Sequence, residues 1–201
     1  MVKIHGMSTS GNCHKVRMVL EALGRPYQWH EIDTRDGTTR TAEFLAMNPN
    51  GQVPVAEIAD GVFLPESNAI MFYLADGSAL IPGDRLLRAR MLQWMFFEQY
   101  SHEPYIAVAR FLRRLHPDPE SQRALADSRM AGGYRALGVM EARLVQTPFL
   151  GGETYTLADI ALYAYTHVAG DGGFDLLRFP AIGQWLARVE AQPGYVRMAA
   201  A

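Results

Sequence analysis

The chain has 201 residues and an apolar fraction of 49%, so it is long enough for one average domain or two small ones with a buried core. Its formal net charge of −2 and pI near 6.3 provide no basic face, which argues against nucleic acid as a partner. A single cysteine excludes an internal disulfide, and without a second thiol we expect no metal site. No signal-peptide stretch and no run of about twenty apolar residues occur, so we expect a cytoplasmic protein with no membrane association.

The first third of the chain alternates between strand and helix patterns. Strand segments show apolar residues at every second position, and helical segments show them every three to four positions. We expect strands at 2–5, 26–32, 53–58 and 62–64, and helices at 13–23, 41–47 and 68–74. A strand-helix-strand opening requires a parallel strand pair with a right-handed crossover. The order βαβαββα predicts a thioredoxin-like domain, of the α/β class, over residues 1–75.

A turn and a proline lie just before the third expected strand. Asn50-Gly51 favours a turn because glycine adopts positive φ without steric penalty. Pro54 cannot donate a ladder hydrogen bond, so it should stand at the start of the strand. The backbone N–H and C=O of Val53 are then open to an extended peptide, which can pair with them as an added strand would.

A carboxylate and a hydroxyl precede the helix that follows the fourth strand. Glu66 and Ser67 lie where the apolar run 68–74 begins, so the Ser67 hydroxyl and the first free helical N–H groups point at one spot. Helix N-termini of this kind favour anions. The plainer alternative is that Ser67 is only a helix cap and Pro54 only a turn proline.

The motif Asn-Pro-x-Gly-x-Val-Pro at 48–54, followed by Glu-Ser-x-Ala-Ile at 66–70, resembles the glutathione-binding half of the cytosolic glutathione transferases. In that family the proline is cis, the valine backbone pairs with the cysteine of glutathione, and the Glu-Ser pair holds the γ-glutamyl amino acid. The resemblance therefore implies glutathione as co-substrate and five substrate-binding residues: Gln52, Val53, Pro54, Glu66 and Ser67.

The rest of the chain reads as helical. Residues 76–84 are rich in Gly, Pro, Asp and Ser, which suits a linker, and residues 85–201 form the expected all-helical domain. Its helices are expected at 85–115 with an interruption at Pro104, 119–145, 156–167 and 179–192. Thr156 and Asp159 form an N-capping pattern at the third of these helices. The resemblance implies that this domain carries a pocket for an electrophile.

Aromatic residues crowd the first long helix of that domain, and Pro104 should kink it. Because this helix lines the electrophile pocket in the family, Tyr100 and His102 are candidate secondary site residues. We nevertheless expect most of the rings to belong to the core, and His102 to be a capped or surface histidine. Gly132-Gly133 in the next helix costs about 1 kcal/mol per glycine, which predicts close packing or a bend.

The loop after the first strand decides the expected chemistry. Thioredoxin-like proteins place Cys-x-x-Cys at this junction, whereas this chain has Ser10-Gly11-Asn12-Cys13. A leading residue at a helix N-terminus is exposed and a residue one turn inside is covered, so Ser10 should face the ligand and Cys13 the protein. The first tyrosine, Tyr27, follows the helix, so the serine-using members of the family, of the bacterial theta, beta and zeta kinds, are the better models.

In those relatives the serine hydroxyl donates to the glutathione sulfur, a role that falls here on Ser10. A thiol with pKa near 8.5 is mostly protonated at neutral pH, and each unit of lowering corresponds to about 1.4 kcal/mol. Asn12 is a candidate second donor, and Ser8 and Thr9 are alternatives to Ser10 in the register of the loop. Ser10 could also be an ordinary helix cap with no catalytic duty.

Our interpretation is a detoxifying glutathione S-transferase, a homodimer as the family is, that conjugates glutathione to a small hydrophobic electrophile. Three alternatives stay open. Cys13 could act as a reactive thiol in thiol transfer or reduction through a mixed disulfide with glutathione. The protein could isomerise a glutathione-activated double bond, or it could bind glutathione without catalysis.

Overall fold

A computed structural model describes residues 1–200, which form two compact units, one of residues 1–78 with 193–200 and one of residues 79–192. The last residue of the expected helical domain, Ala201, lies outside the described residues. The segment that follows Gln192 belongs to the first unit, where Gly194 lies close to the backbone of Glu21.

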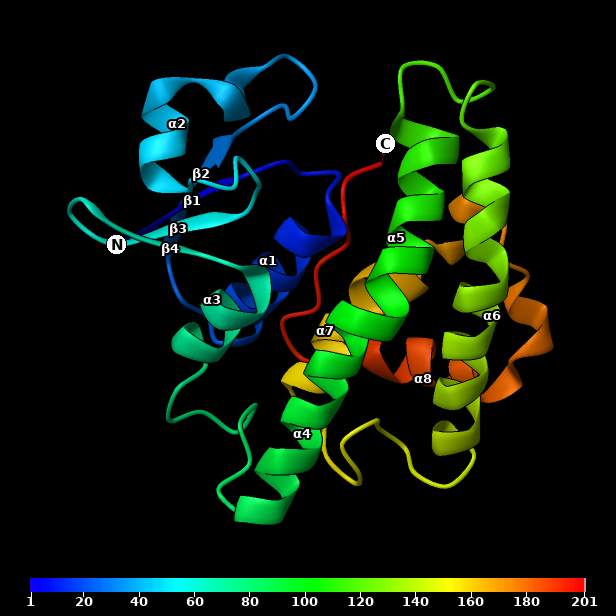
Figure 1. The fold of residues 1–201 in the computed structure, drawn as a ribbon. Helices are drawn as coiled ribbons and strands as arrows, with labels where there is room; N and C mark the ends of the chain where they lie inside the picture. Colours follow the sequence, from blue (N-terminus) through cyan, green and yellow to red (C-terminus); the bar gives the residue numbers. More distant parts are fainter. Residues whose placement is uncertain (201) are drawn as a thin grey trace. The chain divides into compact units, whose positions relative to one another are not determined.

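The first unit contains a four-stranded mixed sheet flanked by helices. Its elements are β1 (Val2–Gly6), α1 (Gly11–Ala22), β2 (Tyr27–Glu31), the short η1 (Thr38–Arg40), α2 (Ala42–Met47), β3 (Val55–Ala59), β4 (Val62–Pro65) and α3 (Ser67–Leu74). The strand order is β2-β1-β3-β4, with β1 parallel to β2 and β3 antiparallel to both of its neighbours. Within this unit α2 lies on one side of the sheet, and α1 and α3 lie on the other (Figure 1). The predicted βαβαββα order is confirmed.

Helices α1 and α3 pack against each other through apolar side chains. Val16, Val19 and Leu20 of α1 are fully buried, as are Ile70 and Met71 of α3. Burying a side chain of this size contributes about 1.5–3 kcal/mol. This packing fixes the N-termini of the two helices within one unit, and both N-termini carry predicted site residues.

The named elements of the second unit are all helices, as predicted. Its elements are α4 (Arg85–Phe97), η2 (Glu98–His102), α5 (Glu103–Arg110), η3 (Phe111–Leu115), α6 (Arg123–Leu144), α7 (Leu157–Thr166), the short η4 (Ala169–Gly172) and η5 (Leu176–Arg178), and α8 (Pro180–Glu190). Helix α5 contacts α6, and α4 contacts α7.

The interruption expected at Pro104 takes the form of a π turn. Proline has no N–H, so the carbonyl of Tyr100 cannot receive its usual bond from the residue four positions on. Instead the N–H of Glu103 donates to the carbonyl of Glu98, five positions back, which defines η2 as a π turn. A second π turn, η3, follows α5.

The predicted capping pattern begins α7. The Thr156 hydroxyl accepts from the Ala158 N–H at 3.3 Å, and the Asp159 carboxylate accepts from the Thr156 N–H at 3.0 Å. Asp159 also accepts from the Leu150 N–H and the Trp185 indole, each at 2.9 Å. The Thr156 hydroxyl also donates to this carboxylate, at 3.3 Å. Burial raises the pKa of Asp159 to about 6, and these four donors oppose the rise.

The glycine pair in α6 marks close packing, as predicted. A Cβ atom on Gly132 would lie 2.2 Å from the ring of Tyr105, and one on Gly133 would lie 2.4 Å from the ring of Phe174. Helix α6 can therefore approach these rings only without side chains at the two positions.

Across residues 1–200, no helix combines the length and apolar character that crossing a membrane requires.

Candidate functional site

Ser10 lies at the N-terminus of α1. It is the N-cap residue, with extended backbone (φ −83°, ψ 127°), and its hydroxyl oxygen accepts from the Cys13 N–H at 3.4 Å. The side chain is partly exposed. Because the Ser10 hydroxyl only accepts the hydrogen bond from α1, its own hydrogen remains available for a further acceptor. The predicted placement of Ser10 ahead of the helix agrees with this geometry.

Ser8, one of the register alternatives, is held by Glu31. The Glu31 carboxylate accepts from the Ser8 N–H at 2.8 Å and from the Ser8 hydroxyl, and it also accepts from the Trp29 indole at 2.7 Å. The Ser8 hydroxyl is thus directed to the end of β2, whereas Ser10 caps α1. The sequence did not indicate that Glu31 would anchor this loop.

Cys13 lies in the protein interior. Its side chain has no exposed surface, and its sulfur accepts from the Met7 N–H at 3.3 Å. A Cβ atom on Gly6 would lie 3.1 Å from this sulfur, so the thiol packs directly on β1. Burial raises the pKa of Cys13 to about 12, against opposing hydrogen bonds from Ser10 and Met7.

The turn before β3 is organised by Asn48. This residue is 4% exposed, its side-chain amide donates to the Gln52 carbonyl at 2.8 Å, and its amide oxygen accepts from the Asn50 N–H at 3.1 Å. Gly51 has φ +61°, and a Cβ there would lie 2.4 Å from the guanidinium of Arg40, which donates to the Asn50 carbonyl at 3.1 Å. Only glycine suits this position, as the turn prediction required.

The Val53–Pro54 peptide bond is cis, as the resemblance implied. Pro54 is buried and Val53 is partly exposed. Strand β3 begins at Val55, whose partner in β1 is His5, so the ladder between these strands does not reach Val53. The strand predicted from residue 53 therefore starts two residues later, and the Val53 backbone lies outside the sheet.

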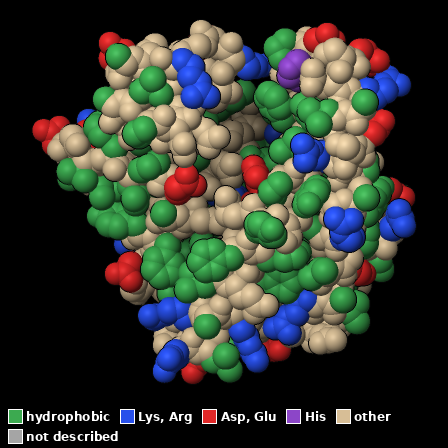
Figure 2. Space-filling model, viewed as in Figure 1, with side chains coloured by type: hydrophobic (Ala, Val, Ile, Leu, Met, Phe, Trp, Pro, Cys, Tyr) green, Lys and Arg blue, Asp and Glu red, His purple; other side chains and the backbone are tan. Residues whose placement is uncertain are grey.

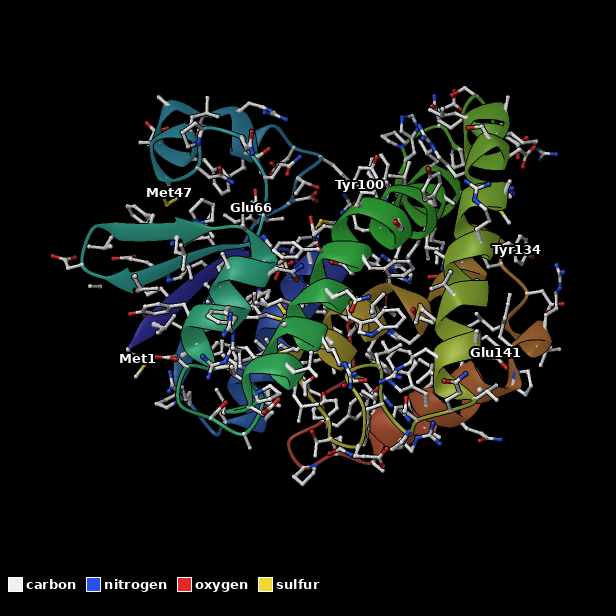
Figure 3. All side chains as sticks on the ribbon, turned by 60° about the horizontal axis from the view of Figure 1, so that its bottom comes forward. Met1, Met47, Glu66, Tyr100, Tyr134 and Glu141 are labelled. Atoms are coloured by element: carbon white, nitrogen blue, oxygen red, sulfur yellow. The ribbon has the colours of Figure 1, made fainter. Side chains whose placement is uncertain are left out.

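Glu66 lies between β4 and α3 and is exposed (Figure 3). It has φ +72° and ψ 109°, and it is the one non-glycine residue with positive φ within residues 1–200. Such a conformation costs about 1–3 kcal/mol, and strain of this kind is concentrated at binding and catalytic sites. The Glu66 side chain makes no capping bond to α3, so it is not held there as an ordinary helix cap.

Ser67, the first residue of α3, is 5% exposed and belongs to a buried polar cluster. Its hydroxyl donates to the amide oxygen of Asn12 at 3.3 Å. The amino group of Lys15 donates to the same amide oxygen at 2.8 Å and to the Ser67 hydroxyl at 3.5 Å. The amide oxygen of Asn12 is thus engaged with Ser67 and Lys15. Sequence reasoning did not single out Lys15.

The two candidates in the second unit differ sharply in exposure. Tyr100 is 86% exposed (Figure 3), whereas His102 is fully buried. The His102 Nε2 lies 2.9 Å from the Thr166 hydroxyl, which itself donates to the Leu162 carbonyl at 2.7 Å. Nε2 must therefore be the donor, which indicates a structural bond. The expectation of a capped or surface histidine is wrong, because His102 lies on the buried side of the helix.

The expectation that most rings of this helix lie in the core is also wrong. Phe96 is 70% exposed and Phe111 is 41% exposed, in addition to Tyr100. Of the rings of this helix, only Trp94 and His102 are buried, and Phe97 and Tyr105 are partly exposed. The buried face carries Met91, Trp94 and Met95, followed by the polar Glu98 and His102. Figure 2 shows hydrophobic side chains exposed over α4, with Lys and Arg side chains near its lower end.

Within residues 1–200, no group of three or more His, Cys, Asp or Glu side chains is arranged to hold a metal ion.

Comparison with known proteins identifies the family. Residues 9–76 match the model of the glutathione S-transferase N-terminal domain, and residues 94–193 match that of the C-terminal domain. A crystal structure of glutathione S-transferase from Pseudomonas fluorescens superposes with a TM-score of 0.95 at 53% identity, covering 98% of each chain. The glutathione transferase URE2P6 of Phanerochaete chrysosporium, solved with oxidized glutathione, has a TM-score of 0.82 at 26% identity, covering 96% of this chain and 92% of that one.

A curated relative, the disulfide-bond oxidoreductase YfcG of Escherichia coli, is 29% identical over 90% of this chain and 87% of its own. The fold, the motifs and these similarities agree. The chain belongs to the glutathione S-transferase family.

Proposed function

We propose that this protein is a glutathione S-transferase that stabilises the thiolate of bound glutathione with Ser10 and conjugates it to a small hydrophobic electrophile. The observation that carries the proposal is the position of the Ser10 hydroxyl at the N-terminus of α1, in the same unit as the cis-proline turn and the start of α3. Family membership supports the same activity.

Glutathione is proposed to bind in an extended conformation. The Val53 backbone, outside the sheet, pairs with the cysteine of glutathione in the manner of an added strand. The exposed Glu66 carboxylate receives the γ-glutamyl ammonium group, and Ser67 with the N–H groups of α3 receives the γ-glutamyl carboxylate. Gln52, which is exposed beside the cis-proline turn, is a further contact.

The chemistry requires a thiolate at neutral pH. The thiol of glutathione loses its proton to solvent, and the Ser10 O–H donates a hydrogen bond to the resulting anion. The positive end of the α1 dipole stabilises the same charge. The thiolate then attacks the electrophilic carbon and forms a carbon–sulfur bond. In a substitution the leaving group departs with its bonding electron pair, and in an addition to an activated double bond the π electron pair moves to the neighbouring carbon, which takes up a proton from solvent. Ser10 lowers the free energy of the nucleophile and does not itself react.

The test is the pKa of bound glutathione, read from thiolate absorbance during a pH titration. Ser10→Ala should raise this pKa by about one unit, the equivalent of one hydrogen bond to a charged group. Ser8→Ala is the matched control, because it removes a hydroxyl from the same loop that is committed to Glu31. An unchanged pKa in Ser10→Ala, or no lowering relative to free glutathione, would refute the enzymatic role.

A thiol oxidoreductase activity is the second candidate, favoured by the similarity to the Escherichia coli disulfide-bond oxidoreductase. If Cys13 is the nucleophile of this activity, its buried thiol must come into contact with the disulfide of the substrate. Cys13→Ala would then abolish exchange between glutathione and a mixed disulfide, whereas full exchange activity in that variant rules out Cys13 as the nucleophile.

The remaining features are proposals from the family resemblance. Product analysis over a panel of electrophiles separates conjugation from double-bond isomerisation, and Tyr100 stays a candidate contact for the electrophile.

A homodimer is supported by the exposed apolar residues Leu86, Leu87 and Phe96 of α4, and light scattering measures the oligomeric state. A cytoplasmic location is checked by cell fractionation.

A further inference from the structure

Lys15 is a fully buried lysine on α1 to which the proposed function assigns no role. The chain has 19 Lys and Arg residues, of which only Lys3 and Lys15 are lysines. The two residue types are not interchangeable, because lysine ends in a compact ammonium with three donors whereas arginine ends in a broad planar group. Lysine therefore stands at a fully buried site in a chain in which, apart from Lys3, every other Lys or Arg residue is an arginine.

The Lys15 amino group connects the first turns of two helices. It donates to the Asn12 amide oxygen on α1 at 2.8 Å and to the Ser67 hydroxyl oxygen on α3 at 3.5 Å. The Ser67 hydroxyl in turn donates to the Asn12 amide oxygen at 3.3 Å. Because the lysine side chain has no acceptor, both oxygens must present lone pairs to it.

This arrangement sets the direction of the Ser67 hydrogen. With a lone pair of Ser67 facing Lys15, the hydroxyl hydrogen has to point away from the amino group, and in this structure it points to Asn12. When a carboxylate binds at the start of α3, the hydroxyl can turn its hydrogen to the ligand. The Asn12 oxygen keeps its bond from Lys15, so the exchange leaves no buried acceptor unsatisfied.

The N–H groups at the start of α3 favour a negative charge at the position that the Ser67 hydroxyl would address. A carboxylate bound there would therefore meet donors from the helix backbone as well as the Ser67 hydroxyl.

We propose that Lys15 is a positioning residue for the α-carboxylate of the γ-glutamyl group. It directs the Ser67 hydroxyl to that carboxylate by occupying one of its lone pairs. This inference rests on the proposed function, since it takes glutathione as the ligand. It extends that function by assigning the recognition of one ligand group to a residue that does not contact the ligand.

The test compares two ligands and two variants by calorimetry. The ligands are S-methylglutathione, which cannot form a thiolate, and its analogue lacking the α-carboxylate, S-methylated 4-aminobutanoyl-Cys-Gly. Lys15→Met should weaken S-methylglutathione roughly 10- to 100-fold, the range for a hydrogen bond to a charged group, and should change the affinity for the analogue by less than about threefold. Lys3→Met, which removes a partly exposed lysine paired with Glu57, should leave both affinities unchanged.

The outcomes separate the two proposals. An equal loss for both ligands in Lys15→Met would show that Lys15 serves only the fold, and no loss for S-methylglutathione would show that it has no role in binding. If the unaltered protein binds neither ligand, the proposed function itself fails.

A measurement on the unaltered protein covers the case in which Lys15→Met does not fold. Isotope labelling of lysine gives only two side-chain NMR signals, from Lys3 and Lys15. Saturating S-methylglutathione should shift the Lys15 signal and the carboxylate-free analogue should shift it much less, with the Lys3 signal as internal reference. Equal shifts of the Lys15 signal with the two ligands would overturn the inference.

Discussion

The buried thiol of Cys13 leads to a quantitative expectation for its reactivity. Burial moves the pKa of this thiol from 9.0 to about 12, so at any pH below 9 the folded protein holds about a thousandfold less thiolate than an exposed cysteine. Its fully buried side chain adds a steric barrier to any reagent. Since only the thiolate reacts, the folded protein at pH 8 should react with a disulfide reagent at least about a thousandfold more slowly than the protein in denaturant.

The assay is simple because Cys13 is the only cysteine in the chain. Reaction with an aromatic disulfide reagent is followed by absorbance, with the protein in strong urea as the positive control and Cys13→Ala as the blank. The native protein should not react within seconds at pH 8. Such a fast reaction, at a rate that does not fall when the folded state is stabilised, would refute the conclusion that burial protects the Cys13 thiol. It would also revive the thiol-transfer alternative.

The same shift makes stability depend on pH in a defined direction. Between pH 9 and 12 the unfolded chain releases the Cys13 proton while the folded protein retains it. The stabilisation from this group is therefore complete below about pH 9 and declines by about 1.4 kcal/mol per pH unit above it. The difference in unfolding free energy between the unaltered protein and Cys13→Ala, measured in urea from pH 8 to 10, should decrease accordingly; a constant difference would contradict the shift.

Two further predictions concern backbone conformation and packing. Glu66→Gly should be about 1 kcal/mol more stable than Glu66→Ala, because glycine relieves the positive φ, while both variants lose affinity for glutathione. Urea unfolding and calorimetry measure the two effects, and a Glu66→Gly variant less stable than Glu66→Ala would show that no strain is released. Gly132→Ala should lower the unfolding free energy by about 1–3 kcal/mol, because its Cβ would meet the Tyr105 ring at 2.2 Å. Gly138→Ala, whose Cβ would meet nothing within 4 Å, should instead raise it by roughly 0.5–1 kcal/mol; equal effects at the two sites would contradict the packing.

Local patterns were sufficient to predict most of the first unit and the cap of α7 in the second unit. The turn at Gly51, the hydroxyl ahead of α1 and the cap at Thr156 each follow from one residue and its near neighbours, so a single sequence contains their causes. The cis bond before Pro54 was predicted from the resemblance, because most X–Pro bonds in folded proteins are trans.

Features that depend on distant partners were not predictable in this way. Lys15 lies 52 positions from Ser67, and no local pattern indicates that a lysine on an apolar helix face will be buried beside it. Similarly, Glu98 and His102 lie on the buried side of their helix. The helical repeat of apolar residues cannot identify them, because both residues are polar. Their environment depends on residues from other helices, such as Thr166, that only the folded chain brings near.

The π turn ahead of Pro104 has a consequence for the rod that runs from Arg85 to Leu115. Each residue of an α-helix advances the direction of its side chain by about 100°, so the one extra residue of a π turn rotates everything after it by that angle. The segment before η2 contacts α7, and the segment after it contacts both α7 and α6 and directs Tyr105 at Gly132. The π turn therefore rotates the side chains of α5 relative to those of α4, so that α5 can pack against α6 while both segments contact α7. Deleting one residue from η2 would change the direction in which α5 presents its side chains much more than it would change the length of the helix.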